Sequence, residues 1–177
     1  MDNKSELRRE VRLRIKSMSA DERLAAAVGI FQRVEELEAF SKARCVAFYA
    51  AMHDEVPTKD WLVRWLELGK RVVVPKVEED IMRFYDYSPD RMVIGAFGIE
   101  EPIAGVECPP EDIDFIVVPA RAFTPDGWRM GRGGGFYDKY MSLPGMRAYK
   151  CGVAFSCQIF DTLPIDAHDI PVDVVIY

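Results

Sequence analysis

The chain has 177 residues, of which 49% are hydrophobic and 29% are charged, and this composition is typical of a soluble globular protein of one domain. The formal net charge of −6 argues against a general nucleic-acid-binding protein. The charged start MDNKSELRRE has no apolar segment typical of a signal peptide, and no apolar run is long enough to cross a membrane. We therefore expect one domain over residues 1–177, located in the cytoplasm.

The charge is unevenly distributed along the chain. Residues 4–16 carry six basic and two acidic side chains, and residues 121–139 carry four basic and two acidic side chains, so the remainder is strongly acidic. Two basic segments in an acidic chain suit a small anionic ligand better than a long polyanion. For residues 4–16, the alternative is an ordinary solvated helix face.

The first two predicted elements are helices. The apolar residues of the first follow one another at spacings of four, four and three, which places them on one face. These residues are Leu7, Val11, Ile15 and Met18. A second helix is predicted to begin after Ser19, which can form a capping box with Glu22. Its expected apolar stripe consists of Leu24, Val28, Phe31, Val34 and Leu37.

The next segments are predicted to alternate between strands and a helix. Residues 44–50 form a β-branched and aromatic run typical of a buried strand. Thr58 can cap a helix that ends at Gly69. The expected buried residues of this helix are Trp61, Leu62, Trp65 and Leu66. Strands are predicted at 71–75 and 81–87.

The second half of the chain continues this alternation. Residues 88–112, rich in glycine, proline and acidic side chains, are expected to form a long surface segment. The remaining predicted elements are a buried strand at 113–120, a helix at 136–142 and strands at 149–156 and 172–177. This order predicts a three-layer, Rossmann-like α/β fold, in which a mostly parallel sheet has helices on both faces. Ligands in such folds bind outside the carboxyl ends of strands, so we expect the chemistry just after residues 50, 75, 119 and 156.

A glycine-rich loop is the most informative segment of the chain. Residues 129–138 read RMGRGGGFYD, directly before the predicted helix at 136–142. Glycines let backbone N–H groups approach a phosphate, and Arg129 and Arg132 can add charged hydrogen bonds. The P-loop motif is absent, and Phe136 breaks the dinucleotide-binding pattern. The alternative is a turn whose glycines serve bending alone.

Three residues that follow the glycines suggest further contacts. Phe136 and Tyr137 offer flat faces on which a ring can stack, although packing of the short helix is the alternative for either. Asp138 is placed to hold a metal ion near phosphates. The four cysteines form no CxxC pair, and we expect Cys45 and Cys151 to be small core residues.

With these residues in view, the chain resembles the 5-formyltetrahydrofolate cyclo-ligase family over nearly its whole length. The glycine loop with its flanks is the most specific part of this resemblance, and the other segments occur in the same order. The matching segments are KSELRREVRLR (4–14), FYAAMHDEVPT (48–58), GIEEP (98–102), DFIVVPARAFTPDGWRMGRGGGFYDKYM (114–141), GVAFSCQ (152–158) and LPIDAHDIPVD (163–173).

The resemblance implies an ATP-dependent ring closure. The enzyme is expected to phosphorylate the formyl oxygen of 5-formyltetrahydrofolate, after which N10 attacks the activated carbon and phosphate leaves to give 5,10-methenyltetrahydrofolate. The implied partners are therefore ATP, Mg²⁺ and the folate, with no nucleic acid and no membrane. A monomer is the simplest expectation at this size.

The resemblance also implies roles for individual residues. The implied ATP-binding residues are Lys4, Arg8, Arg129, Gly131, Arg132, Gly133, Gly134, Gly135, Phe136 and Tyr137. The implied folate-binding residues are Met52, Glu55, Phe136 and Tyr137. Arg132 and Tyr137 are the implied catalytic residues, and Asp138 and Asp169 the implied magnesium ligands. Considered without the family, Glu55 would more often be an exposed loop residue.

The sequence departs from the family pattern in two places. Many relatives have tyrosine where Phe136 stands, and some have lysine where Gly134 stands. The expected mechanism requires neither His53 nor His168. The alternative functions are a nucleotide-binding regulatory module without catalysis, and an ATP-dependent ligase or kinase that acts on another heterocycle.

Overall fold

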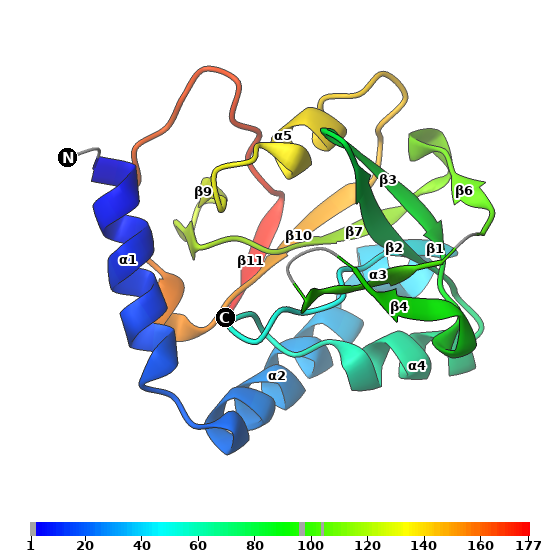
Figure 1. Cartoon of the computed structure of the whole chain (residues 1–177), viewed down its shortest axis with the longest axis horizontal. Coiled ribbons are helices and arrows are strands. Elements are labelled where there is room, and N and C mark those ends of the chain that lie inside the picture. The colour runs from blue at the N-terminus through cyan, green and yellow to red at the C-terminus, as the bar shows by residue number, and fades with distance from the viewer. Residues whose placement is uncertain (1–2, 96–97, 104) are drawn as a thin grey trace.

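The computed structural model describes residues 3–95, 98–103 and 105–177. Within these residues one large sheet forms the centre of the molecule (Figure 1). Its strands are β1 (Cys45–Ala47), β2 (Arg71–Glu78), β3 (Ile81–Asp86), β6 (Glu107–Cys108), β7 (Phe115–Val118), β10 (Tyr149–Val153) and β11 (Val174–Ile176). Two smaller sheets pair β4 (Met92–Ile94) with β5 (Glu100–Pro102) and β8 (Ala122–Phe123) with β9 (Arg129–Met130).

The large sheet is mostly parallel, as predicted. Its strand order is β11-β10-β7-β1-β2-β3-β6, and the strands from β11 to β2 all run in one direction. β3 and β6 extend one edge in antiparallel pairing. The carboxyl ends of β1, β7 and β10 therefore meet at one edge of the sheet, and the loops that follow them are neighbours.

Helices cover both faces of the sheet. The helices are α1 (Asn3–Lys16), α2 (Ala20–Glu35), α3 (Glu38–Lys42), α4 (Lys59–Glu67) and α5 (Phe136–Met141). Helices α2 and α4 lie against one face and α5 lies against the other, while α1 stands at one end of the molecule (Figure 1). This arrangement confirms the predicted three-layer α/β fold.

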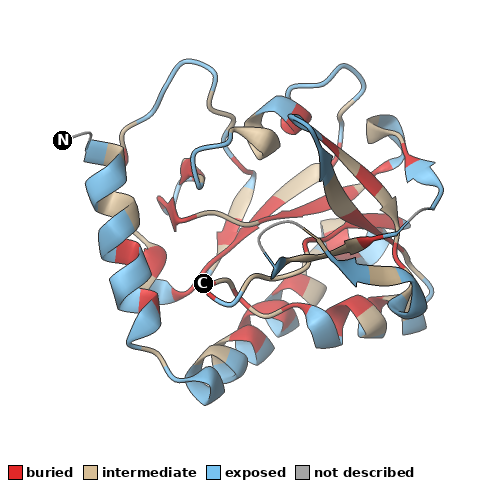
Figure 2. Cartoon of the chain, viewed as in Figure 1, coloured by how far each residue is buried: buried red, intermediate tan, exposed pale blue. Residues whose placement is uncertain are grey.

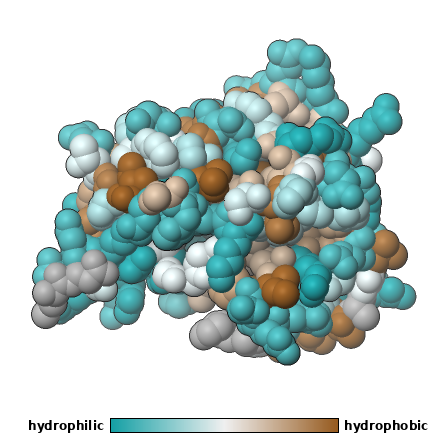
Figure 3. All heavy atoms as spheres, turned by 90° about the horizontal axis from the view of Figure 1, so that it is seen from above, coloured by the Kyte–Doolittle hydropathy of each residue, from teal (hydrophilic) through white to brown (hydrophobic). Residues whose placement is uncertain are grey.

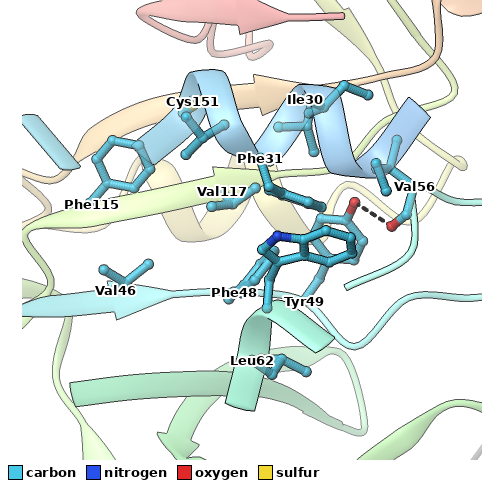
Figure 4. Close-up of a cluster of buried hydrophobic side chains, with 14 of the residues drawn as sticks. Ile30, Phe31, Val46, Phe48, Tyr49, Val56, Leu62, Phe115, Val117 and Cys151 are labelled. Carbon is cyan, nitrogen blue, oxygen red and sulfur yellow. Dashed lines mark hydrogen bonds between the residues drawn. The ribbon is translucent and has the colours of Figure 1, made fainter. Parts of the chain in front are cut away.

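Two apolar cores fill the space between the layers, and buried residues follow the strands and the inner faces of the helices (Figure 2). The larger core contains an aromatic cluster in which Phe48 stacks on Trp65 with ring centroids 4.2 Å apart. Phe31 of α2 meets the edge of Phe48 at 5.3 Å, and the Tyr49 hydroxyl donates to the carbonyl of Val56 at 2.9 Å (Figure 4). This cluster anchors the loop that follows β1.

The second helix differs from its predicted stripe. The side chains of Leu24 and Val28 are 43% and 53% exposed, and the helix ends at Glu35, before Leu37. Its buried residues are Ala27, Ile30, Phe31 and Val34. Because apolar residues occur on more than one side of this helix, periodicity alone did not select the face that packs. The first helix follows its prediction, with Val11 and Ile15 fully buried and Leu7 and Met18 packed at the edge of the core.

The capping prediction for Thr58 was wrong. Its hydroxyl makes no capping hydrogen bond to α4. It donates to the carbonyl of Tyr49 at 2.8 Å and accepts from the N–H of Ala51 at 3.0 Å. Thr58 therefore closes the loop after β1. At Ser19 the predicted cap forms, because its hydroxyl accepts from the N–H of Glu22 at 3.0 Å.

Several strand boundaries also differ from the prediction. β1 has three residues and β2 continues to Glu78, so position 75 lies within a strand and is not a strand end. The expected surface segment 88–112 contains β4, β5 and β6, and its residues 96–97 and 104 lie outside the described residues.

Candidate functional site

The turn after β1 presents two neighbouring carboxylates. The Glu55 N–H donates to the Met52 carbonyl at 3.1 Å, and the Glu55 carboxylate accepts from the Met52 N–H at 2.8 Å. These two bonds fix the turn and leave the second oxygen of Glu55 available. Asp54 beside it is buried, with 6% of its surface exposed. A buried carboxylate needs a charged or hydrogen-bonded partner.

Two arginines from distant segments provide that partner. Arg121, just after β7, donates through Nη1 to Oδ2 of Asp54. Arg132, in the glycine loop, donates through Nη2 to Oδ1 of Asp54 at 2.5 Å. The same Nη2 lies 3.8 Å from Oε2 of Glu55. The four side chains form one cluster, which we call the Asp54 cluster: Asp54, Glu55, Arg121 and Arg132.

Backbone contacts hold Arg121 in position. Its N–H donates to the Met130 carbonyl at 2.8 Å. Gln158, which follows β10, donates through Nε2 to the carbonyls of Ala120 and Arg121 at 3.0 and 3.1 Å. The side-chain oxygen Oε1 of Gln158 in turn accepts from the N–H of Phe155 at 2.8 Å. The ends of β7 and β10 are thus tied together beside the cluster.

The glycines of the loop are required by its geometry. Gly133 and Gly135 have φ values of +116° and +70°, a region that other residues rarely adopt. Gly135 directly precedes α5, so the chain turns sharply into this helix. At Gly134 a Cβ atom would lie 2.6 Å from the Phe136 ring. The two departures from the family pattern are therefore in contact, and a larger side chain at position 134 would require the Phe136 ring to move.

The two carboxylates of the turn have opposite pKa shifts. Burial acts to raise the pKa of Asp54, but the hydrogen bonds from Arg132 and Arg121 outweigh it and lower the pKa to about 2. Burial raises the pKa of Glu55, and Arg132 opposes this shift only in part. Asp54 is therefore ionised at neutral and mildly acidic pH, whereas Glu55 is the carboxylate of the pair that takes up a proton first as the pH falls.

Arg129, which the sequence analysis assigns to phosphate binding, is a buried residue with several contacts inside the protein. Its side chain is 4% exposed, and it donates to Oδ1 of Asp138 at 3.1 Å and to the carbonyl of Pro119 at 3.3 Å. Its Nε is buried and has no hydrogen-bond partner in the described parts of the chain. The guanidinium also lies over the Tyr137 ring, 5.6 Å from its centroid. Arg129 thus ties the end of β7 to the start of α5.

The Tyr137 ring lies beside the Arg129 guanidinium at the start of α5. Burial raises its pKa strongly, with a further increase from the Glu55 carboxylate and a smaller decrease from Arg129. Tyr137 therefore keeps its hydroxyl proton at neutral pH. The Glu55 carboxylate and the Arg129 guanidinium thus act on the protonation of this hydroxyl in opposite directions.

The two predicted metal ligands lie on adjoining segments. Oδ1 of Asp138 accepts from Arg129 and from the N–H of Ile170, the latter at 3.1 Å. Oδ2 of Asp169 accepts from the N–H of Asp166 at 2.8 Å. Each carboxylate thus has one oxygen that accepts no hydrogen bond from the described residues. Carboxylate oxygens are the ligand type that Mg²⁺ prefers, so the chemistry of each residue fits that ion. Among the described residues, the three carboxylate and imidazole groups that lie within 4.8 Å of one another are those of Asp166, His168 and Asp169, a group that does not include Asp138.

Helix α1 closes one side of the site. Arg8 donates through Nε to the Gly131 carbonyl at 2.9 Å, which attaches the helix to the glycine loop. Lys4 donates to Asp166 at 2.5 Å and lies 3.8 Å from Asp169. The basic segment 4–16 is thus more than a solvated face, because two of its side chains reach the loops of the site.

The structure therefore brings the predicted site residues into one region, around the glycine loop, the β1 turn and the start of α5. It adds three residues that the sequence analysis did not single out, namely Asp54, Arg121 and Gln158. All three lie just after strands β1, β7 and β10, where the fold predicts ligand sites. That position was the available signal. A cavity of about 240 Å³ beside α2, lined by Gly29 and Arg33 among others, contains none of the site residues.

Two further features are the distribution of hydrophobic residues over the surface and the apolar character of the helices. On the face seen in Figure 3, hydrophobic residues are scattered in small groups among hydrophilic ones. Over the described residues, no helix has the length and apolar character needed to cross a membrane.

Comparisons with known proteins give consistent results. Residues 1–177 match the 5-formyltetrahydrofolate cyclo-ligase family. A probable 5-formyltetrahydrofolate cyclo-ligase of Caenorhabditis elegans is 29% identical over 98% of this chain and 92% of that protein. The 5-formyltetrahydrofolate cyclo-ligase of Escherichia coli K12 is 32% identical over 76% of this chain and 78% of that protein.

Solved structures agree with this assignment. The NMR structure of Aquifex aeolicus 5,10-methenyltetrahydrofolate synthetase matches with a TM-score of 0.87 and 39% identity, over 98% of this chain and 88% of that one. A 5,10-methenyltetrahydrofolate synthetase from Mycoplasma pneumoniae matches with a TM-score of 0.79 and 28% identity, over 99% of this chain and 98% of that one.

Proposed function

The chain belongs to the 5-formyltetrahydrofolate cyclo-ligase family, and on this premise we propose that it converts 5-formyltetrahydrofolate and ATP to 5,10-methenyltetrahydrofolate, ADP and phosphate. The observation that carries the proposal is the position of Arg132. This side chain starts in the glycine loop, which suits phosphates, and reaches the Asp54–Glu55 turn, which suits a pterin. A group transferred from ATP to the folate has to cross this interval.

The reaction has two stages. In the first, the formyl oxygen attacks the γ-phosphorus of ATP, the bond to the bridging oxygen of ADP breaks, and the formyl carbon becomes electrophilic. In the second, N10 attacks this carbon and loses its proton, and the carbon–oxygen bond breaks to release phosphate. The first stage depends on positioning and charge neutralisation, and the second on holding N10 against the carbon.

The nucleotide is proposed to bind along the glycine loop. Backbone N–H groups of Gly133, Gly134 and Gly135 can approach phosphate oxygens without a Cβ atom in the way. Lys4 and Arg8 of α1 add positive charge from the side. Arg129 contributes its charge from within the protein, because its side chain is almost fully buried.

The folate is proposed to bind at the β1 turn. The available oxygen of Glu55 can accept hydrogen bonds from pterin N–H groups. Met52, Phe136 and Tyr137 are partly buried and offer apolar surface beside it. Arg132, between the two sites, is proposed to bind the transferred phosphoryl group, and the protonated Tyr137 hydroxyl to donate a hydrogen bond there.

Asp138 and Asp169 are proposed to hold Mg²⁺ through the oxygens that their hydrogen bonds leave available. When bound, Mg²⁺ supplies charge neutralisation at the phosphate oxygens. We further propose a single domain that acts as a monomer in the cytoplasm. The four free cysteines support a reducing compartment.

The experiment that tests the function measures the near-ultraviolet absorbance of the methenyl product at neutral pH with Mg–ATP. We expect ATP-dependent product from the unaltered protein and a loss of about a hundredfold in kcat for Arg132→Ala. Arg147→Ala is the matched control, because this arginine is exposed and pairs with Asp114 away from the site. ATP binding without product would contradict the proposal and indicate a regulatory module or another heterocyclic substrate.

A further inference from the structure

The two arginines that share the Asp54 carboxylate have different exposures. The Arg121 side chain is 9% exposed and belongs to the interior, whereas the Arg132 side chain is 33% exposed and borders solvent. Asp54 itself is 8% exposed at its side chain. The inner pair is therefore a fixed part of the protein, and Arg132 is the partner that an arriving ligand can reach.

Asp54 leaves much of the Arg132 guanidinium available. One nitrogen, Nη2, donates to Asp54. Nε and Nη1 have no hydrogen-bond partner in the portion of the chain that the structure covers. An arginine held by one amino group presents its remaining donors in a fixed plane, which suits phosphate recognition. A flexible arginine on a glycine loop would otherwise have to be ordered during the reaction, at a cost in side-chain entropy.

We propose that Asp54, anchored by Arg121, is a positioning residue that holds the Arg132 guanidinium between the glycine loop and Glu55 for phosphoryl transfer. This inference rests on the proposed function. It assigns Asp54 no contact with substrate. Arg121 has two effects in this arrangement: it fixes the carboxylate in place, and it shares the negative charge, so that Arg132 is oriented without being fully neutralised.

The geometry separates this role from folate binding by Glu55. Asp54 and Glu55 are adjacent, but Glu55 is fixed by its own hydrogen bonds to Met52. Loss of the Asp54 charge should therefore disturb Arg132 while the Glu55 turn persists. The expected signature is a fall in kcat with little change in either KM.

The test is a double-mutant cycle of Asp54→Asn and Arg132→Ala, with kcat and both KM values measured for each variant. We expect Asp54→Asn alone to lower kcat about a hundredfold, in line with the cost of misplacing a catalytic group. In the Arg132→Ala background the same substitution should change kcat by less than about threefold, because Asp54 then has no guanidinium to position.

A second variant guards against misfolding. Asp54→Asn leaves Arg121 buried without its partner, which is costly. The variant Asp54→Asn/Arg121→Met removes both charges of the inner pair, so that no charge of this pair is left buried without its partner. We expect it to fold, to bind an ATP analogue like the unaltered protein, and to show the same low kcat. Asp86→Asn is the control, because it removes an ion pair with Arg71 on β2, away from the site.

The outcomes are distinct. Equal proportional losses from Asp54→Asn in both backgrounds, or a large increase in the folate KM with kcat unchanged, would overturn the positioning role while leaving the proposed function intact. An unaltered protein that forms no methenyl product would overturn both. Non-additive losses in kcat, with the folded state and nucleotide binding preserved, would establish the role of Asp54.

Discussion

Adjacent residues in the β1 turn differ in their protonation because they differ in their partners. Asp54 accepts hydrogen bonds from two guanidinium groups, which stabilise its charge despite burial. Glu55 accepts one backbone N–H, and its nearest guanidinium nitrogen is 3.8 Å away. The guanidinium partners thus make Asp54 a charged anchor, whereas Glu55 has a carboxylate oxygen that remains available to a ligand.

The raised pKa of Glu55 predicts a pH dependence of folate binding. The carboxylate form accepts pterin N–H groups, so affinity is complete above the raised pKa and falls as pH decreases through it, at a higher pH than for an ordinary glutamate. Besides burial, this pKa is set by Arg132, by the hydrogen bond from the Met52 N–H, and by Asp54 and Arg121. Equilibrium binding of 5-formyltetrahydrofolate, measured from neutral to mildly acidic pH, tests the prediction.

Glu55→Gln is the matching variant. We expect it to weaken folate binding at neutral pH by about 1.5–3 kcal/mol, the contribution of a hydrogen bond to a charged group. It should also remove the acid-side decrease in affinity and leave ATP-analogue binding unchanged. An acid-side decrease of the same size in Glu55→Gln would assign the titration to another group, such as the ligand itself.

At the scale of elements, α1 illustrates how one helix serves both stability and function. Its inner face buries Val11 and Ile15 completely, while its first turns send Lys4 and Arg8 to the loops of the site. The packing thus determines where the basic side chains lie. A helix with the same charges and no apolar face would not hold them against the glycine loop.

Substitutions on opposite faces of α1 should differ sharply in their effect on stability. Ile15→Ala removes a fully buried side chain and should lower the free energy of unfolding by about 3 kcal/mol. Leu13→Ala removes one that is 58% exposed and should change it by less than about 0.5 kcal/mol. Urea denaturation of the two variants measures the difference. Similar losses in both would mean that the outer face of α1 is covered in solution.

Elements with a strong periodic pattern could be predicted from the sequence, whereas their packing faces could not always be. α1 has one apolar stripe, so its buried face follows directly from the spacing. α2 has apolar residues on two sides, and it buries Ala27 and leaves Val28 exposed, a choice that the spacing alone does not determine. Likewise, Thr58 has a typical capping position, but its hydroxyl oxygen accepts from the N–H of Ala51 and from no N–H of α4.

At the scale of the whole molecule, the site depends on contacts between residues far apart in the chain. Asp54 and Arg121 are separated by 67 positions and Asp54 and Arg132 by 78. The rule that ligands bind at the carboxyl ends of parallel strands located the region, and the family resemblance supplied the residue types. Neither indicates which arginine pairs with which carboxylate, because pairing is decided by side-chain geometry after the strands have assembled.

A site built from separate segments should be stabilised by each of its ligands. The glycine loop, the β1 turn and the start of α5 adopt their arrangement only in the folded protein, so ligands that bind there stabilise it by mass action. At about a hundred times its dissociation constant, each ligand should add roughly 2.7 kcal/mol to the free energy of unfolding.

We expect a non-hydrolysable Mg–ATP analogue and 5-formyltetrahydrofolate to contribute additively if they bind independently, and more than additively if each orders Arg132 for the other. Thermal unfolding with each ligand alone and with both measures these contributions. Stabilisation by the ATP analogue with none from the folate would indicate a nucleotide-binding module. If the β1 turn is the pterin site, Glu55→Gln at the same ligand concentrations should strongly reduce the folate contribution and leave that of the ATP analogue unchanged.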